Sequence, residues 1–475
     1  MNLRILKESV VVLFAAWLCV SCSLYKAPGQ REAQEVPSAY QAAMPGTLAP
    51  DEWWRAFEDE QLNGLMVRAL GGNLSIEQAA ARLRQAEASA VKSGAARFPS
   101  LNGTAGAGTK YTGEEGKKTV NADSFSLGLS ASYELDLWGR VASGRRAALR
   151  AMEASRFDLE TAAMTIAGKT ATTYFYWQQQ QNKLLILTRQ LESNRKMLSV
   201  VEKRFQTAQA SAVDVLQQRQ KVAASEASIP PVQSAVSASE HALAILIGEA
   251  PQTDLNLTVL PFIELPAMPE TGLPADLLIR RPDLQAAWAR LEAADWNVRA
   301  AQADRLPAIK LTGTAAYGAE TTDALFQNWV MNLAAGLTAP LIDGGTRRAE
   351  AARTKAVADE RVAAYRETVI GALGEVEDAL AAEIHQREYR SAILRQSTAA
   401  QLTAEESFRR YTRGLNSYFE ALSTETARQS LEVAVLQAEY DLRADRVQLY
   451  RVLGGDWNSI LQNYRNVDFK GNDHD

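Results

Sequence analysis

The chain has 475 residues, of which 47% are hydrophobic and 23% are charged. This composition supports a packed core and excludes a globally disordered chain. The net charge is −5, from 51 basic and 56 acidic residues without a basic block, so we expect no nucleic-acid partner. The three histidines and two cysteines form no group with metal-ligand spacing, and no apolar run is long enough for a membrane-spanning helix.

The N-terminus has the features of a targeting segment. Arg4 and Lys7 precede an apolar run over 10–20. This run is too short to span a bilayer, but its length is typical of the apolar part of a signal peptide. The sequence therefore predicts that the segment is removed in the mature protein.

The end of this segment resembles the lipobox of bacterial lipoproteins. Ser21 is small and precedes Cys22, although Cys19 stands where leucine is usual. We expect a signal peptide over 1–21 and a lipidated Cys22 that carries diacylglycerol and palmitate. The alternative is an ordinary signal peptide cleaved nearby. Aspartate after the lipidated cysteine is the inner-membrane retention signal of such lipoproteins, so Ser23 implies sorting to the outer membrane.

Motifs recur along the chain at a nearly constant offset. Ala81-Arg82-Leu83 returns as Ala289-Arg290-Leu291 after 208 positions, and Asp214-Val215-Leu216 matches Glu420-Ala421-Leu422 after 206. Such regular self-similarity predicts an internal duplication. The predicted parts are a signal peptide over 1–21, an N-terminal anchor over 22–58, repeat 1 over 59–248, a proline-rich linker over 249–282, repeat 2 over 267–454 and a tail over 455–475.

Each repeat contains two stretches in which apolar and small polar residues alternate strictly. We expect strands at about 100–112, 123–135, 308–318 and 328–341. Their length and Ser/Thr/Gly faces fit transmembrane β-strands around a wet lumen. The alternative is a soluble sheet with one solvated face. Four strands cannot close a barrel, so chains must pool them. Two chains would give eight strands and a barrel filled by side chains, whereas three give twelve strands and an aqueous bore.

Long proline-free segments rich in Ala, Gln, Glu, Arg and Leu follow the strands. They predict a helix over 141–206 and returning helices over 212–247 and 418–453, with turns near 206–213 and 412–417. Pro230-Pro231 should interrupt the first returning helix. A soluble coiled-coil rod is the alternative, but it explains neither the strands nor the lipobox.

Motifs along nearly the whole mature chain resemble those of the bacterial outer membrane efflux factors, which are TolC-like, and within them the lipoprotein branch that serves multidrug pumps. The resemblance implies a protein that is mainly α with membrane β. In such a homotrimer a 12-stranded barrel crosses the outer membrane and long antiparallel coiled helices form a periplasmic tunnel. The main matching motifs are Trp53-Trp54-Arg55-Ala56-Phe57, Tyr133-Glu134-Leu135-Asp136-Leu137-Trp138-Gly139-Arg140, Arg280-Arg281-Pro282-Asp283-Leu284, Pro340-Leu341-Ile342-Asp343-Gly344-Gly345, Arg410-Tyr411 with Gly414, and Leu453-Gly454-Gly455-Asp456-Trp457.

The resemblance also implies partners and a gate. The partners are a periplasmic adaptor, an inner-membrane pump of the RND type and the lipid of the outer membrane. The gate is a ring near the second turn, for which Glu420 with its counterpart Asp214 and the apolar Phe419 are the candidates; a solvated helix carboxylate is the alternative for Glu420. The predicted adaptor-contacting residues at the tips are Ala208, Ser211, Gly414 and Ser417.

The predicted function is a passive outer-membrane exit duct that exports drugs and toxic small molecules from the periplasm or from the pump. Two other functions stay open, the exit duct of a type I protein-secretion system and a non-conducting, lipid-anchored spacer. A passive duct needs no nucleotide site, and no GxxxxGK[ST] motif occurs. An enzyme is not expected, because none of the many Asp and Glu pairs on the predicted helices is distinguished by its spacing. Asp136, which follows a predicted strand, is expected to cap the next helix.

Overall fold

The structure is a computed structural model that describes residues 36–41, 52–113, 115–116, 120–454 and 457. The predicted signal peptide, Cys22 and most of the predicted tail lie outside these residues. The chain forms two compact units, one containing 85–154 and 287–366 and the other containing the remaining described residues. None of the described helices is both long enough and apolar enough to cross a membrane.

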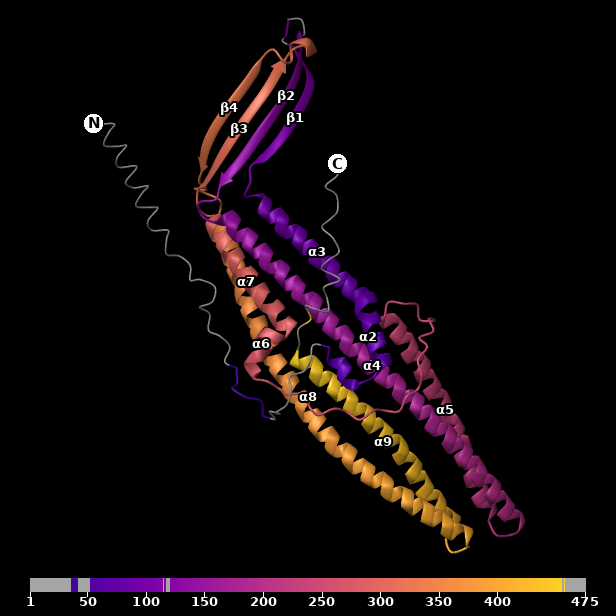
Figure 1. Ribbon diagram of the computed structural model, residues 1–475. Helices are drawn as coiled ribbons and strands as arrows, with labels where there is room; N and C mark the ends of the chain where they lie inside the picture. Colours follow the sequence, from indigo (N-terminus) through magenta and orange to yellow (C-terminus); the bar gives the residue numbers. More distant parts are fainter. Residues whose placement is uncertain (1–35, 42–51, 114, 117–119, 455–456, 458–475) are drawn as a thin grey trace. The chain divides into compact units, whose positions relative to one another are not determined.

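One antiparallel sheet holds the strands in the order β1-β2-β3-β4 (Figure 1). Residues directly opposite each other share a character: Leu127 faces Ala105 and Tyr317, whereas Ser130 faces Asn102 and Thr314. One face of the sheet is therefore apolar and the other rich in hydroxyls, as the alternation predicts. Within the described residues, β1 and β4 each have a strand on one side only. The bounds are β1 Ser100–Thr112, β2 Val120–Leu135, β3 Ala308–Ala319 and β4 Trp329–Thr338.

The sheet passes into helices through two similar corners. Asp136 accepts hydrogen bonds from the backbone N–H groups of Val141 (3.0 Å) and Ala142 (2.7 Å), so its predicted capping role is confirmed. Asp343 accepts from the N–H groups of Gly345 (2.9 Å) and Arg347 (3.2 Å). These donors hold the pKa of the Asp343 carboxyl below its usual range.

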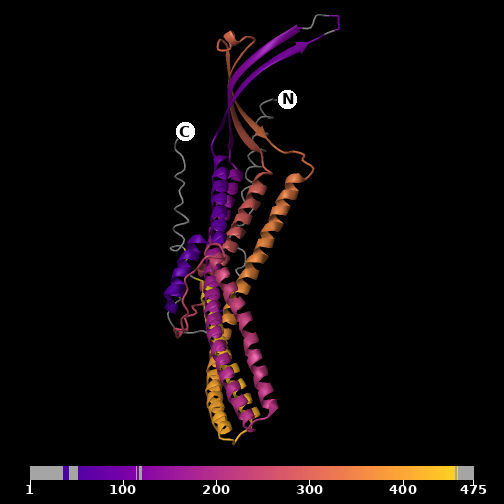
Figure 2. The ribbon, with the colours of Figure 1, turned by 90° about the vertical axis from the view of Figure 1, so that its right-hand side faces the viewer.

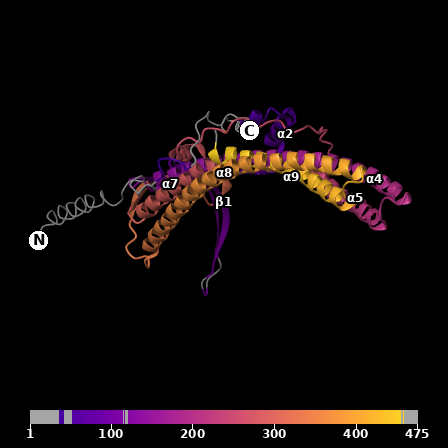
Figure 3. The ribbon, with the colours of Figure 1, turned by 90° about the horizontal axis from the view of Figure 1, so that it is seen from below.

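Two helical hairpins make up most of the second unit. Helices α4 (Arg140–Gln206) and α8 (Thr346–Thr412) have 67 residues each, about 100 Å at ~1.5 Å per residue. Each reverses into a shorter helix, α5 (Ala212–Leu246) or α9 (Tyr418–Leu453), which returns beside it (Figure 2). Seen from below, the two hairpins lie next to each other (Figure 3). The other elements are η2 Trp53–Phe57, α2 Glu60–Gly72, α3 Leu74–Ala95, η3 Pro274–Asp276, α6 Leu277–Arg280, α7 Pro282–Ala303 and η4 Thr322–Ala324.

The predicted interruption at Pro230-Pro231 is wrong. Helix α5 continues through both prolines. Each proline removes one N–H donor, but its fixed φ is close to the helical value. Both rings lie on the exposed side of the helix. The carbonyls that lose their donors can therefore turn to water, and this lowers the cost of continuing the helix.

The core of the second unit contains an aromatic cluster, and hydrogen bonds attach the connector, which is the predicted linker over 249–282, to helix α9. Trp53 stacks on Tyr450 with ring centroids 5.5 Å apart, and Phe57 lies 4.9 Å from Phe175. Arg446 of α9 donates to the carbonyls of Pro266 and Ala267, both at 3.1 Å. The proline-rich connector thus has little regular structure but is bound to the returning helix.

Candidate functional site

The ends of the two hairpins are built alike. After α4, Ala208 adopts a left-handed conformation with φ 56°, and the N–H of Gln209 donates to the carbonyl of Arg204 at 2.7 Å. After α8, Gly414 has φ 76°, and the N–H of Leu415 donates to the carbonyl of Arg410 at 2.9 Å. Glycine adopts this conformation without strain, whereas alanine loses about 1 kcal/mol there. Both predicted turns are therefore sharp reversals that satisfy the helix C-terminus.

The two predicted gate carboxylates both belong to helix caps. Asp214 accepts the N–H of Ser211 at 2.8 Å while the Ser211 hydroxyl accepts the N–H of Asp214 at 3.2 Å. Glu420 and Ser417 repeat this capping box at the start of α9, at 3.3 and 3.2 Å. The caps position both carboxylates at the first turn of a returning helix, where the helix dipole favours a negative charge. A further role in a gate stays a prediction.

Apolar side chains at the same ends are open to solvent in the single chain. The exposed fraction is 67% for Phe419 and 66% for Leu415 on the second hairpin. Val213 and Leu216 on the first hairpin are also exposed. The structure thus places Phe419 next to Glu420 at the second tip but does not bury it.

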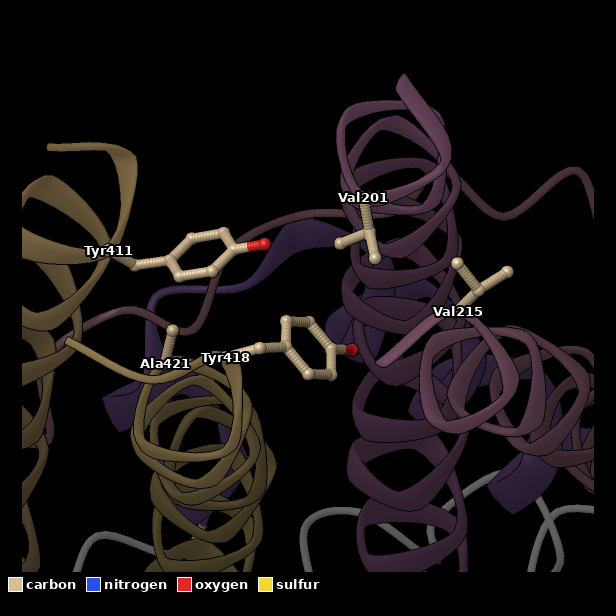
Figure 4. Close-up of a cluster of buried hydrophobic side chains, with 5 residues drawn as sticks. All are labelled: Val201, Val215, Tyr411, Tyr418 and Ala421. Atoms are coloured by element: carbon tan, nitrogen blue, oxygen red, sulfur yellow. The ribbon is translucent and has the colours of Figure 1, made fainter. Parts of the chain in front are cut away.

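A cluster of five buried residues joins the two hairpins just above their ends (Figure 4). Its members, which we call the latch, are Val201, Val215, Tyr411, Tyr418 and Ala421. The two tyrosine rings meet edge to face with centroids 5.8 Å apart. Both hydroxyls point toward the first hairpin, which contributes the two valines (Figure 4). The latch is an apolar contact between the first and the second hairpin near the tips.

Polar contacts reinforce the latch. The Tyr418 hydroxyl donates to Oε1 of Gln218 at 2.5 Å, and Nε2 of Gln218 donates to the carbonyl of Asn194 at 2.7 Å. Burial raises the pKa of Tyr418, with the charge of Asp214 contributing, so the hydroxyl stays a donor at neutral pH. Arg204 places its guanidinium 4.6 Å above the Tyr411 ring and donates to that residue's carbonyl at 3.3 Å.

Farther from the tips, side-chain amides form a polar seam between α4 and α9. Gln190 donates to the carbonyl of Gln429, Gln429 donates to the side-chain oxygen of Asn194, and Gln179 donates to the side-chain oxygen of Gln437, each at 3.0 Å. Each neutral hydrogen bond contributes only about 0.5–1.5 kcal/mol, because water can replace it. The seam specifies how the hairpins align but opposes their separation less than an apolar core would.

The sequence pointed to the hairpin ends but not to the latch. Tyr411 was recognised only as part of a motif, and Tyr418 was not singled out. A run of glutamines over 178–181 was the visible signal of a polar seam. Among the described residues, no group of three or more His, Cys, Asp or Glu side chains could hold a metal ion.

A sheet continued by two 67-residue helices is the fold of an outer-membrane channel. The solved outer-membrane channel OprN matches with a TM-score of 0.85 and 28% identity, over 91% of this chain and 99% of that chain. The sequence model of the family described as outer membrane efflux protein matches residues 65–249 and 273–455. The chain belongs to the outer membrane efflux protein family.

Characterised relatives agree with this assignment. The pyoverdine export outer membrane protein OpmQ of Pseudomonas aeruginosa is 34% identical over 86% of this chain and 88% of its own length. The cation efflux system protein CusC of Escherichia coli is 28% identical over 92% of this chain and 96% of its own length. The chain is therefore an efflux channel of the Gram-negative outer membrane with a large periplasmic helical part.

Proposed function

We propose that three copies of this chain form the exit duct of a tripartite efflux pump. The observation that carries the proposal is a four-stranded sheet that runs directly into helices of 67 residues and whose two outer strands, within the described part of the chain, are each paired on one side only. Unpaired edges are unfavourable in a membrane because backbone N–H and C=O groups there have no partner. Pairing β1 of one copy with β4 of the next removes every free edge in a closed barrel of twelve strands.

Exposure of the strands supports the same assembly. Leu101 on β1 is 68% exposed and Leu333 on β4 is 77% exposed in the single chain. Both belong to the apolar face of the sheet, which suits contact with lipid. The opposite face, rich in serine and threonine, suits a wet lumen.

We further propose that the channel wall arose by duplication, with repeats at 59–248 and 267–454. The returning helices end alike, because Gly248 has φ 82° and Gly454 has φ 74°. A Cβ at Gly248 would lie 2.0 Å from the carbonyl oxygen of Gly72, and one at Gly454 would lie 2.6 Å from that of Arg280. Each glycine therefore lets one helix end pack directly on the backbone that begins its repeat.

The proposed partners are a periplasmic adaptor and an inner-membrane pump of the RND type. The adaptor contacts the tips through Ala208, Ser211, Gly414 and Ser417. We expect small toxic molecules as cargo, because the relatives are named for pyoverdine export, cation efflux and toluene efflux. A lipid on Cys22 provides an additional anchor. Cys22→Ala should abolish incorporation of labelled palmitate, and retained label would contradict the lipidation.

In the closed duct we expect the latch to hold the second hairpin to the first, with Phe419, Glu420 and Asp214 around the narrow mouth. Binding of the adaptor to separated tips would shift the population toward the open state. The proposal as a whole is tested by native mass measurement in detergent together with current measurement in planar bilayers. A trimer with an ionic current is expected. A mass near one or two chains, or a trimer that conducts no ions, would overturn it.

A further inference from the structure

A cavity of about 360 Å³ lies between α4, α8 and α9 beside the latch. Met197 and Val200 of α4 form one wall, and Ala404 and Phe408 of α8 form another. Tyr418 of the latch closes it from α9. The cavity thus shares two residues, Tyr418 and Ala421, with the latch that joins the hairpins.

The size and lining of this cavity suit a small organic molecule. Ligand pockets usually enclose about 300–1,000 Å³ and are lined mainly by apolar and aromatic side chains with a few polar groups. Here seven of the fifteen lining residues are apolar or aromatic, Phe408 and Tyr418 among them, and the polar ones include Gln401 and Glu405.

The charges around the cavity disfavour an anionic ligand. Arg428 is paired with Glu425 at 2.8 Å and Glu432 at 3.4 Å. Lys196 lies 3.8 Å from Glu192. An anionic ligand would find no unpaired cation among the described residues that line this cavity, and it would lie near the carboxylate of Glu405, which accepts a hydrogen bond from Nε2 of Gln401 at 3.1 Å.

We propose that the cavity binds a small, uncharged aromatic molecule, and that the bound molecule holds the latch closed. The walls come from both hairpins, so separation of the hairpins takes the binding site apart. A ligand that binds only the closed arrangement stabilises that arrangement by mass action. The effect on gating rests on the proposed function as a duct, whereas binding itself does not.

Thiol protection tests the binding. The probe is 1-naphthol, added to the full-length protein with a Met197→Cys substitution, and a water-soluble maleimide then labels the thiol. The matched control is Leu402→Cys on α8, where the native side chain is 64% exposed and outside the cavity lining. Mass spectrometry of the labelled peptides separates these positions from the only native cysteines, Cys19 and Cys22.

We expect 1-naphthol to slow labelling at position 197 at least five-fold and to leave position 402 unchanged. The charged analogue 1-naphthalenesulfonate should protect at least ten-fold less well at the same concentration. No protection, equal protection at both positions, or equal protection by the sulfonate would overturn the assignment. This measurement requires no conducting channel, so it can fail or succeed independently of the proposed duct.

Two further variants examine the cavity and its coupling to the latch. Ala404→Met fills the cavity, and Phe408→Ala removes part of its wall. Because the Phe408 side chain is already 41% exposed, its loss should not prevent folding, and at least this variant can be measured. Protection at position 197 should be lost in the first and weakened in the second. In planar bilayers 1-naphthol should lower the open fraction of the wild-type channel at least two-fold and leave Ala404→Met unaffected. Protection without this change would overturn the coupling to the latch.

Discussion

The carboxylate of Glu383 and the guanidinium of Arg446 are both fully shielded from solvent and approach to 2.5 Å. The pair joins α8 to α9 well away from the hairpin tips. Arg446 also donates to the connector carbonyls of Pro266 and Ala267. One buried arginine therefore ties both helices of the second hairpin to the segment between the proposed repeats.

Loss of one partner of this pair should destabilise the protein strongly. Glu383→Gln leaves the positive charge of Arg446 buried without a counter-charge, and breaking such pairs costs about 3–5 kcal/mol. We expect a clear decrease in the apparent melting temperature of the detergent-solubilised protein, followed by far-UV circular dichroism. The control is Glu388→Gln on the same helix, where an exposed carboxylate lies 3.2 Å from His385 and contributes about 0–1 kcal/mol. Equal melting of both variants would show that the pair is not needed for stability.

The latch should control how often the channel opens. Tyr418→Phe removes the donor to Gln218 and leaves a buried acceptor unpaired, which costs about 1–3 kcal/mol. Since 1 kcal/mol corresponds to about five-fold in an equilibrium constant, the open fraction in planar bilayers should rise at least five-fold. Tyr389→Phe on α8 is the matched control, because that side chain is 49% exposed and lies outside the latch. An unchanged open fraction in Tyr418→Phe would show that the hydrogen bond to Gln218 does not influence gating.

Sequence patterns predicted the strands, turns and caps that depend on residues close together in the chain. The alternation over 124–135 was sufficient to identify β2 except for its first four residues, and the reversals near Ala208 and Gly414 followed from a break in helical pattern. The cap at Asp136 was predictable because it satisfies backbone donors five and six residues later. Helices α2, α3 and α7 were not singled out, since their shorter apolar stripes gave no comparable signal.

Contacts between distant segments were not predictable from the same patterns. The bond between Tyr418 and Gln218 spans 200 positions of the sequence. Nothing near either residue distinguishes a latch from an ordinary helix surface. The prediction for the prolines in α5 was wrong because proline raises the free energy of a helix without forbidding it. On the exposed side of a helix, water can bind the carbonyls that lose their N–H donors, and this lowers the cost.

The predicted gate residues can be examined separately from the latch. Glu420→Gln combined with Asp214→Asn removes two charges per chain, while the amide oxygens can still accept the capping N–H groups of Ser417 and Ser211. We expect lower cation selectivity, measured as a reversal potential in a salt gradient at about 0.1 M, where exposed charges act over ~10 Å. The control for a general loss of negative charge is Glu406→Gln on α8, where the native carboxylate lies 2.9 Å from the guanidinium of Arg409.

The exposed Phe419 tests the apolar part of the same mouth. Phe419→Ala should raise basal conductance if three copies of this ring narrow the opening, because truncation widens a hydrophobic constriction. Leu402→Ala provides a control at another exposed apolar side chain, on α8. If neither the charge variants nor Phe419→Ala changes selectivity or conductance, the constriction lies elsewhere in the channel.

A half-buried carboxyl on α9 should make stability depend on pH. Burial, with smaller contributions from the negative charges of Asp441 and Glu383, raises the pKa of Asp445 to about 6. An unfolded aspartate has a pKa near 4, so between about pH 4 and 6 the folded state binds more protons than the unfolded state. The contribution of this group to stability therefore decreases as pH rises through this window, and above it the folded protein contains an unfavourable charge.

Asp445→Asn should remove this dependence. Near pH 4.5 the native carboxyl is largely protonated and resembles the amide, so the variant and the wild type should melt at similar temperatures. At pH 7 the variant should be the more stable of the two, because it has no charge to bury. Glu388→Gln, at the exposed site used above, should follow the wild type at both pH values. A difference between Asp445→Asn and wild type that stays constant from pH 4.5 to 7 would mean that Asp445 does not titrate in this range in the folded protein.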